Sequence, residues 1–509
     1  MPKFYIDLSP PIPNIPKFAD KKQVDVIYPL IYPYAYARIK YVPQLGDLIY
    51  FVLEPKLTDT EKQALELIEE GLKEVLNVGF SRFKDVKKAL EYLEDNVQFV
   101  MSELGIDLPD ESYNKIMYYI FRDFIGLGPI EPLMHDPFIE DIECSGVNIP
   151  VFVVHRIFGN LRTNIIFKDE EEIRKLIEKM AQRAGRYVSY AEPILDATLP
   201  DGSRVNATYT SDITTRGPTF TIRKFRKEPL TPIDLILNGT ATPEIFAYFW
   251  LAVEYKRNIL VIGPTAAGKT TFLNAILMFI PPTARIVTIE ETREIQLYHE
   301  NWIPAVSRPA FGLSGYGEVS LFDLLKASFR QRPDYVVVGE IRGEEAYVLF
   351  QGMASGHACL STMHATDVKA VVRRLITPPI NLPPSLVELL DIVASMIHFK
   401  DKSGSIRRVL KETYEIMEVY QNGDVKYNVP FRYNFARNTF EFYGTSYVFK
   451  KISKEYGISE EELWEELKIR ARLLRKLAEL GIRDYRIFTK IIQAYYIDKN
   501  YVLSYYGLR

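Results

Sequence analysis

The chain has 509 residues, of which 47% are hydrophobic, and its formal net charge is −3 with a pI near 6.2. This length and apolar content suffice for several buried cores, so we expect two to four domains, while the near-neutral charge argues against a nucleic-acid-binding surface over the whole chain. Cys144 and Cys359 are too few and too far apart for a disulfide framework, which favours a reducing, cytoplasmic location.

The sequence predicts neither a signal peptide nor a membrane span. Residues 1–7 contain no apolar stretch of the kind that signal peptides carry. The apolar run at 26–33 is interrupted by prolines, and the run at 246–253 is too short to cross a bilayer. We therefore expect a cytoplasmic protein that reaches the inner face of the cell membrane only through partners.

Residues 1–109 are predicted to form an extended and helical region. Its first part, to residue 58, is rich in proline and tyrosine with the alternating apolar runs of short strands. From Thr58, apolar residues recur at helical spacing in two stretches that end near residues 76 and 104. A proline-containing linker then opens an α/β domain over 110–228, which ends in a basic hinge at 224–229.

The most informative segment is Gly263-Pro264-Thr265-Ala266-Ala267-Gly268-Lys269-Thr270, which fits the pattern G-x-x-x-x-G-K-[ST]. An apolar run precedes it and Thr271 opens a helical pattern, so a strand, a tight turn and a helix follow in the required order. Its glycines let backbone N–H groups converge on phosphate oxygens, Lys269 reaches the β and γ phosphates, and Thr270 ligates Mg²⁺. The structural alternative is a glycine-containing turn with a surface lysine, and the order of elements favours ATP binding.

Polar residues also follow three other predicted strands. The run 335–338 ends in Gly339-Glu340, where a carboxylate would hold Mg²⁺ or polarise the attacking water. The run 286–289 ends in Glu290-Glu291, and the segment 356–365 carries His357 and His364, which lack the spacing and ligand company of a zinc site. Because parallel strands deliver such residues to one edge of a sheet, we expect them beside the phosphate loop. An ordinary strand-end glutamate is the alternative for Glu340.

Together these four segments resemble the four signatures of the secretion-superfamily ATPases, the hexameric motors of type II and type IV secretion, type IV pili and the archaellum. The similarity extends upstream to the segments 126–142 and 199–207. With two cysteines, the sequence has no four-cysteine zinc module, which points to the archaeal branch. The resemblance implies an α/β protein with a RecA-like P-loop motor at 229–400, an N-terminal α/β domain, and a strand and mostly helical subdomain at 401–509.

Carried over by position, the resemblance makes Lys269 and Thr270 the phosphate and metal contacts, and Glu340 the catalytic carboxylate and a metal contact. Glu290 and Glu291 match the acidic box of the family, which more often reads Glu-Asp. The role of this pair is left open between positioning water and supporting Mg²⁺.

The resemblance also implies a histidine and three arginines at the nucleotide. His364 is expected to sense the γ-phosphate or to link neighbouring subunits, whereas His357 supports its loop. Arg216 and Arg223 resemble arginines that face the nucleotide from the N-terminal domain, and Arg330 resembles a further γ-phosphate arginine. For each arginine, a plain surface position is the alternative.

The sequence thus predicts a Mg²⁺-dependent ATPase that forms a homo-hexamer and drives assembly of a type IV pilus-like or archaellum-like filament through a polytopic membrane platform protein. Two alternatives stay open. One is a hexameric nucleic-acid translocase, which the net charge disfavours. The other is a nucleotide-gated scaffold without hydrolysis, against which Lys269, Thr270 and Glu340 argue.

Overall fold

The computed structural model describes residues 4–11, 15–16, 18, 20–76, 85–225, 228–308, 317–400 and 406–508. The chain forms two compact units that divide between Phe225 and Arg226, within the segment that the sequence marks as a hinge. The sequence predicts four segments, 1–109, 110–228, 229–400 and 401–509. The first supplies strands to the sheet of the second, and the fourth supplies strands to the sheet of the third, so the four segments form two units.

The first unit is built on a nine-stranded sheet, counted over the part of the chain that the structure describes, with the order β1-β2-β3-β6-β5-β4-β9-β8-β7. Its neighbours are antiparallel except β3 and β6, which pair in parallel and so join the first three strands to the rest. The strands are β1 (Asp25–Ile31), β2 (Ala35–Val42), β3 (Asp47–Leu53), β4 (Ile139–Cys144), β5 (Pro150–His155), β6 (Gly159–Ile166), β7 (Ile194–Thr198), β8 (Arg204–Thr208) and β9 (Thr219–Arg223).

Helices of the first unit share one hydrophobic core with this sheet. The first long helix begins where the sequence predicts it, because the Thr58 side chain and Glu61 form a reciprocal capping box. The helical segments are η1 (Lys21–Gln23), α1 (Asp59–Val75), α2 (Val86–Leu104), α3 (Asp110–Ile120), the π-helix η3 (Phe121–Ile125), η4 (Gly128–Ile130), α4 (Glu131–Met134) and α5 (Glu170–Arg183).

The second unit contains another nine-stranded sheet, again counted over described residues, in the order β12-β11-β13-β14-β10-β15-β16-β17-β18. Strands from β12 to β15 are parallel, and those from β15 to β18 are antiparallel. The strands are β10 (Ile259–Ile262), β11 (Ile286–Glu290), β12 (Trp302–Val306), β13 (Tyr335–Val338), β14 (Ala358–Met363), β15 (Ile392–Lys400), β16 (Ile406–Val419), β17 (Val425–Asn434) and β18 (Thr439–Phe442).

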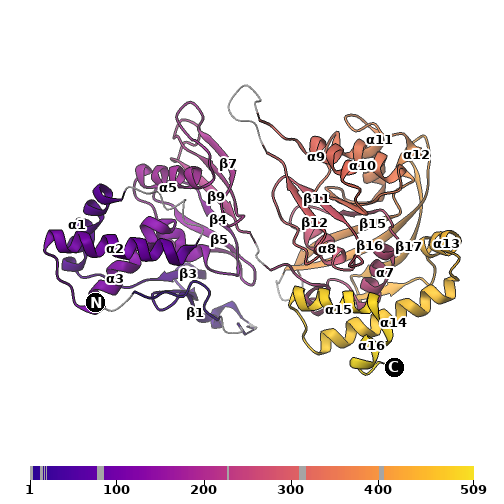
Figure 1. The fold of residues 1–509 in the computed structure, drawn as a ribbon, viewed down its shortest axis with the longest axis horizontal. Helices are drawn as coiled ribbons and strands as arrows, with labels where there is room; N and C mark the ends of the chain where they lie inside the picture. The colour runs from indigo at the N-terminus through magenta and orange to yellow at the C-terminus, as the bar shows by residue number, and fades with distance from the viewer. Residues whose placement is uncertain are drawn as a thin grey trace. The chain divides into compact units, whose positions relative to one another are not determined.

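Helices cover both faces of this second sheet (Figure 1). In β10, Ile259 and Val261 pack into the core beneath one helical layer, whereas Leu260 and Ile262 pack into the other. This alternation is why β10 reads as a continuous apolar run. One layer holds α6 (Pro232–Leu237), α7 (Pro243–Glu254), α8 (Lys269–Leu277), α13 (Tyr447–Tyr456), α14 (Glu460–Glu479), α15 (Tyr485–Ile497) and α16 (Lys499–Tyr505), and the other holds α9 (Leu321–Ser328), η5 (Phe329–Gln331), α10 (Glu345–Ala354), α11 (Val368–Ile376) and α12 (Pro384–Val387).

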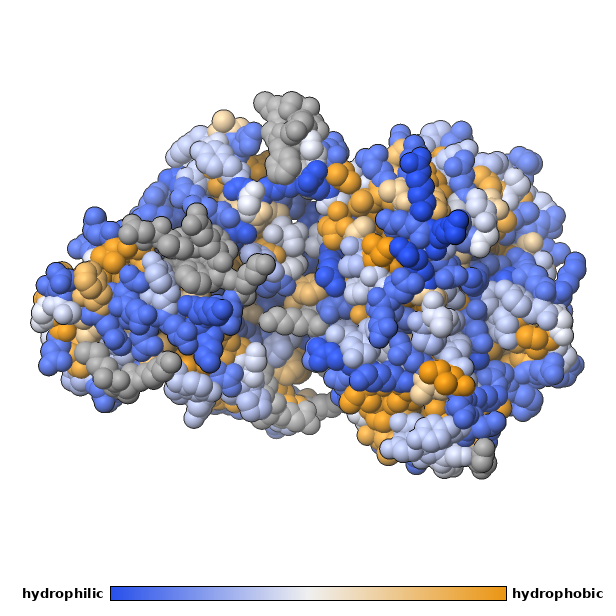
Figure 2. Space-filling model, viewed as in Figure 1, coloured by the Kyte–Doolittle hydropathy of each residue, from blue (hydrophilic) through white to orange (hydrophobic). Residues whose placement is uncertain are grey.

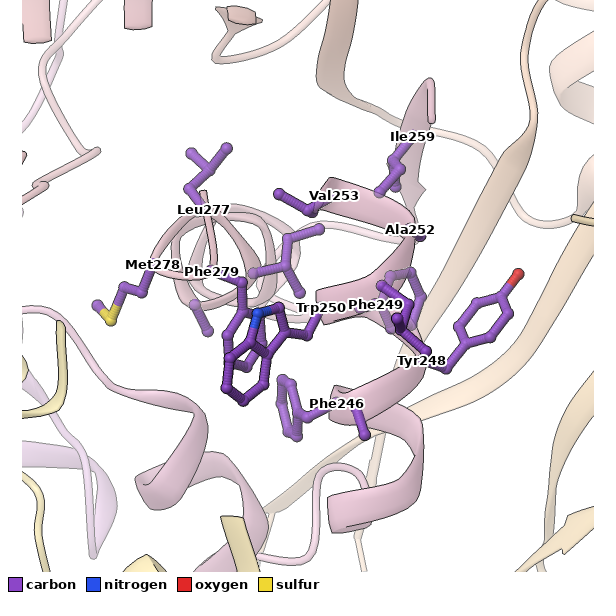
Figure 3. Close-up of a cluster of buried hydrophobic side chains, with 14 of the residues drawn as sticks. Phe246, Tyr248, Phe249, Trp250, Ala252, Val253, Ile259, Leu277, Met278 and Phe279 are labelled. Carbon is purple, nitrogen blue, oxygen red and sulfur yellow. The ribbon is translucent and has the colours of Figure 1, made fainter. Parts of the chain in front are cut away.

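The helix α7 anchors the C-terminal helices to the sheet of the second unit. Every residue from Ile245 to Val253 is buried. Figure 3 shows the aromatic side chains of α7, with Trp250 beside Phe279, which follows α8. Trp250 stacks on Phe279 with ring centroids 5.1 Å apart and donates a hydrogen bond to the Tyr496 hydroxyl at 2.9 Å. The run at 246–253, which the sequence marks as too short for a membrane span, is therefore a core helix.

Hydrophilic residues cover much of the face drawn in Figure 2, with smaller apolar patches between them. Within the described ranges, no helix has both the length and the apolar character that crossing a membrane requires.

Candidate active site

The phosphate loop joins β10 to α8. Gly263 has a φ of 150°, and a Cβ at this position would clash with the carbonyl oxygen of Met396 on β15. Gly268, with a φ of 88°, is the N-cap residue of α8 and has no side chain with which to cap the helix. A glycine at this position leaves room for an anion at the first turn, which suits a helix N-terminus that binds phosphate. Within the loop, Pro264, Thr265 and Ala266 are exposed and Ala267 is buried, while Thr270 and Thr271 on α8 are half-buried.

Lys269 is directed into the site rather than into solvent. Its side chain belongs to a residue that is only 8% exposed, so it is not the surface lysine of the structural alternative. Its Nζ donates a hydrogen bond to the carbonyl of Pro264 at 3.1 Å and lies 3.2 Å from Nδ1 of His364, at the end of β14. Burial and the charge of Lys269 lower the pKa of His364, which favours a neutral imidazole that accepts from the lysine.

Glu340 follows β13 and faces the same histidine. His364 Nε2 lies 3.2 Å from Glu340 Oε1, but this contact lacks hydrogen-bond geometry, so Oε1 has no hydrogen-bond partner among the described residues. The other oxygen, Oε2, accepts from Arg342 at 2.7 Å. Burial raises the pKa of Glu340, yet the hydrogen bond and charge of Arg342, together with the charge of Lys269, outweigh burial and hold that pKa below its ordinary value. The carboxylate is therefore ionised at neutral pH, as a base must be.

The two glutamates after β11 lie in different environments. Glu290 is 3% exposed, and its Oε1 accepts the backbone N–H groups of Glu294 and Ile295, each at 2.9 Å. Its Oε2 is buried without a hydrogen-bond partner in the described part of the chain, and burial raises the pKa of Glu290 to about 7. Glu291 is exposed and lies 3.5 Å from Arg342 Nη1. Arg342 thus links Glu291 to Glu340.

Two other predicted residues lie apart from this cluster. Arg330 is exposed on η5, which precedes β13, whereas Glu340 follows that strand, so β13 separates them within one chain. His357 packs on Phe329 with ring centroids 5.0 Å apart, and its Nδ1 lies 3.3 Å from the carbonyl of Gly352. It supports its own loop, as the sequence suggests.

Arg216 and Arg223 belong to the first unit, and both are exposed. The carbonyl of Arg216 accepts a hydrogen bond from Val147 N at 3.0 Å, which fixes the backbone of its loop. Arg223 ends β9 and pairs in register with Asp141 on β4. Their contact with nucleotide stays a prediction.

Sequence reasoning missed two arginines at the site. Arg342 stands two residues after Glu340, and the run of charges around it was a signal for its role. Arg408 lies on β16, and its Nε donates to the carbonyl of Ala266 in the phosphate loop at 2.9 Å. No local pattern identifies Arg408, because its position depends on strand pairing.

Comparison with known proteins places the chain in a family. The family described as "Type II/IV secretion system protein" matches residues 125–396, more than half of the chain, and "PilB3-like, C-terminal" matches residues 437–506. The protein MJ0900 of Methanocaldococcus jannaschii is 37% identical over 520 residues, covering 97% of this chain and 92% of its own length. The "Type IV secretion system protein PtlH" of Bordetella pertussis is 30% identical over 281 residues, covering 48% of this chain and 81% of its own length.

Among solved structures, the ATPase DotB of Legionella pneumophila is 16% identical, covers 73% of this chain and 95% of its own, and has a TM-score of 0.42. The fold class expected from the sequence is confirmed by the topology: the chain is an α/β protein with an N-terminal α/β domain, a mostly parallel sheet that carries the phosphate loop, and a C-terminal helical region. The chain belongs to the type II/IV secretion system protein family.

Proposed function

We propose that this protein hydrolyses ATP with Mg²⁺ and uses the energy to assemble a type IV pilus-like or archaellum-like filament. The observation that carries the proposal is the chain of contacts from Lys269 through His364 to Glu340. His364 and Glu340 follow the carboxyl ends of the parallel strands β14 and β13, and Lys269 begins α8 after the loop that follows the neighbouring strand β10, so all three lie at the edge where α/β sheets bind ligands.

The residues present fit a nucleotide with its metal ion. The glycine at 263 permits the close turn of the loop, and Lys269 and the N–H groups of α8 supply positive charge for the phosphates. Thr270 and Glu340 would hold Mg²⁺, which when bound neutralises phosphate charge. Glu340 Oε1, buried and without a hydrogen-bond partner in the residues described, is the acceptor for a proton of the attacking water.

His364 would report nucleotide binding. Its ring lies between the phosphate-loop lysine and the carboxylate, at 3.2 Å from each. A phosphate bound to Lys269 would compete with His364 for the ammonium group. Nucleotide binding would therefore change the contact of His364 with Lys269 and, through the same ring, its contact with Glu340. Arg216, Arg223 and Arg330 would complete the charge at the γ-phosphate in a homo-hexamer, where arginines of this kind accelerate phosphoryl transfer by roughly 10³ to 10⁵.

The proposal of a filament and a membrane platform is supported by the family rather than by the site. The family description names type II and type IV secretion, and the C-terminal match is described as PilB3-like. We infer a location at the inner face of the cell membrane through a polytopic platform protein.

Phosphate release by the full-length chain tests the enzymatic proposal. Wild-type protein should release phosphate from ATP in the presence of Mg²⁺, and this release should stop when EDTA is added. Lys269→Ala should abolish turnover because it removes the charge that neutralises the β and γ phosphates. Lys468→Ala, which removes an exposed lysine paired with Glu465, is the matched control and should keep full turnover. Turnover by Lys269→Ala within a few-fold of wild type would contradict the assignment of the loop.

Two further measurements address the biological role. Light scattering in the presence of nucleotide should give the mass of a hexamer. Cells that lack the gene should lose their surface filaments, and expression of the wild-type protein, but not of Lys269→Ala, should restore them. DNA-stimulated turnover with a steep salt dependence would instead favour a nucleic-acid translocase.

A further inference from the structure

Arg408 reaches the phosphate loop from a strand of the C-terminal segment. Its Nε donates to the carbonyl of Ala266 at 2.9 Å, and its Cδ lies 3.5 Å from the position that a Cβ on Gly268 would occupy. The contact is possible because β16 pairs with β15, and β15 pairs with β10, the strand that leads into the loop. A side chain 142 residues further along the chain is thereby placed against the loop.

The carbonyl that Arg408 binds belongs to a residue with an unfavourable backbone conformation. Ala266 has a φ of 61°, in the left-handed region that is unfavourable for a residue with a side chain. A residue adopts such a conformation only where its surroundings compensate for the cost. The hydrogen bond from Arg408 is a compensating contact at this position.

The same hydrogen bond sets the direction of a loop amide. Because the peptide unit is planar and trans, a carbonyl of Ala266 held towards Arg408 directs the N–H of Ala267 to the opposite side. That N–H donates a hydrogen bond to the carbonyl of Pro264, with N and O 3.3 Å apart, and the same carbonyl also accepts from Lys269 Nζ at 3.1 Å. The amide of Ala267 and the ammonium group of Lys269 therefore converge on one acceptor inside the loop.

We propose that Arg408 is a positioning residue, which holds the peptide between Ala266 and Ala267 and so keeps the phosphate loop in the conformation that binds nucleotide. This inference rests on the proposed function, because it assumes that the loop binds a nucleotide. A guanidinium suits the task because it keeps its charge at every physiological pH and makes a stronger hydrogen bond to a carbonyl than a neutral donor does. Through Arg408, the strands β16 to β18 are connected to nucleotide binding.

Equilibrium binding of fluorescent ATP and ADP analogues with Mg²⁺ to the full-length chain tests this role. Arg408→Ala should raise the Kd of both analogues about tenfold, the effect of losing one charged hydrogen bond, while kcat at saturating ATP falls less. Arg408→Lys keeps the charge and a donor and should restore most of the affinity. Arg408→Met keeps the aliphatic stem without the donors, and serves as the second variant if Arg408→Ala does not fold.

Arg407→Ala is the matched control. Arg407 neighbours Arg408 on β16, but its Nη1 donates to Asn438 at 2.9 Å, so its loss should leave the Kd of both analogues unchanged. Wild-type affinity in both Arg408→Ala and Arg408→Met would overturn the positioning role, as would an equal loss of affinity in Arg407→Ala. A wild-type chain that binds neither analogue would overturn the proposed function and this inference with it.

Discussion

Glu290 should make the folding stability of the nucleotide-free protein depend on pH, and Glu290→Gln should remove that dependence. The carboxyl is 3% exposed and one of its oxygens is buried without a hydrogen-bond partner among the described residues. Burial raises its pKa from 4.5 to about 7. An acid whose pKa is higher in the folded than in the unfolded chain stabilises the fold while it is protonated, and this stabilisation is lost as pH rises from the unfolded to the folded pKa.

The two pKa values set the size of the effect. They differ by about 2.5, which corresponds to about 3 kcal/mol over the whole range, and about 2 kcal/mol of this falls between pH 5.5 and pH 8. Glutamine keeps the oxygen that accepts the N–H groups of Glu294 and Ile295 and carries no titrating proton. Relative to Glu290→Gln, the wild type should therefore lose about 2 kcal/mol of unfolding free energy between these two pH values.

Urea unfolding of both full-length proteins at the two pH values, followed by circular dichroism, measures this difference. The other titrating groups are common to both proteins, so they cancel when wild type and variant are compared at each pH. Glu291→Gln, at the neighbouring exposed carboxyl, is the control and should leave the pH dependence of the wild type in place. A gap between wild type and Glu290→Gln that is the same at both pH values would refute the reasoning from burial.

The remaining predictions concern the chemistry. Glu340→Gln should bind ATP with near wild-type affinity but hydrolyse it at least about 100-fold more slowly, because the amide keeps the shape of the side chain and loses the base. Glu344→Gln, in the same segment, is the control. Loss of nucleotide binding in Glu340→Gln as well would show that Glu340 has a structural role. Arg216→Ala and Arg223→Ala should each lower kcat more than nucleotide affinity, since charge that develops in the transition state loses stabilisation. Full kcat in both variants would rule out a role in hydrolysis for these two arginines.

Much of the site was predictable because its signals are local. A phosphate loop requires a strand, a glycine turn and a helix in succession, and the sequence from Ile259 to Leu277 shows all three. The strand that carries Glu340 and the strand that ends at Glu290 were likewise visible as apolar runs followed by charge. The roles of Glu340, Arg216 and Arg223 stay predictions, which the experiments above address, and the roles of Glu290 and Arg330 at the nucleotide stay predictions as well.

Other parts depended on contacts between residues far apart in the chain. The sequence treats 1–109 as a separate region, yet β3 pairs with β6 and draws the first strands into the sheet of the N-terminal α/β domain. Likewise β16, in the segment after residue 400, pairs with β15 and extends the motor sheet. Strand pairing of this kind depends on register and packing between distant segments, which no local pattern specifies.

The phosphate loop, the order of its elements, the charged strand ends and the family that these motifs resemble could all be predicted from the residues alone, because local periodicity and backbone requirements depend on neighbouring residues. Which charged groups meet depends instead on how the chain folds. Lys269 contacts a histidine 95 residues away, and Ala266 an arginine 142 residues away. Burial, and with it the raised pKa of Glu290, is also a property of the folded sheet, because the loss of water around a carboxyl depends on every segment packed against it.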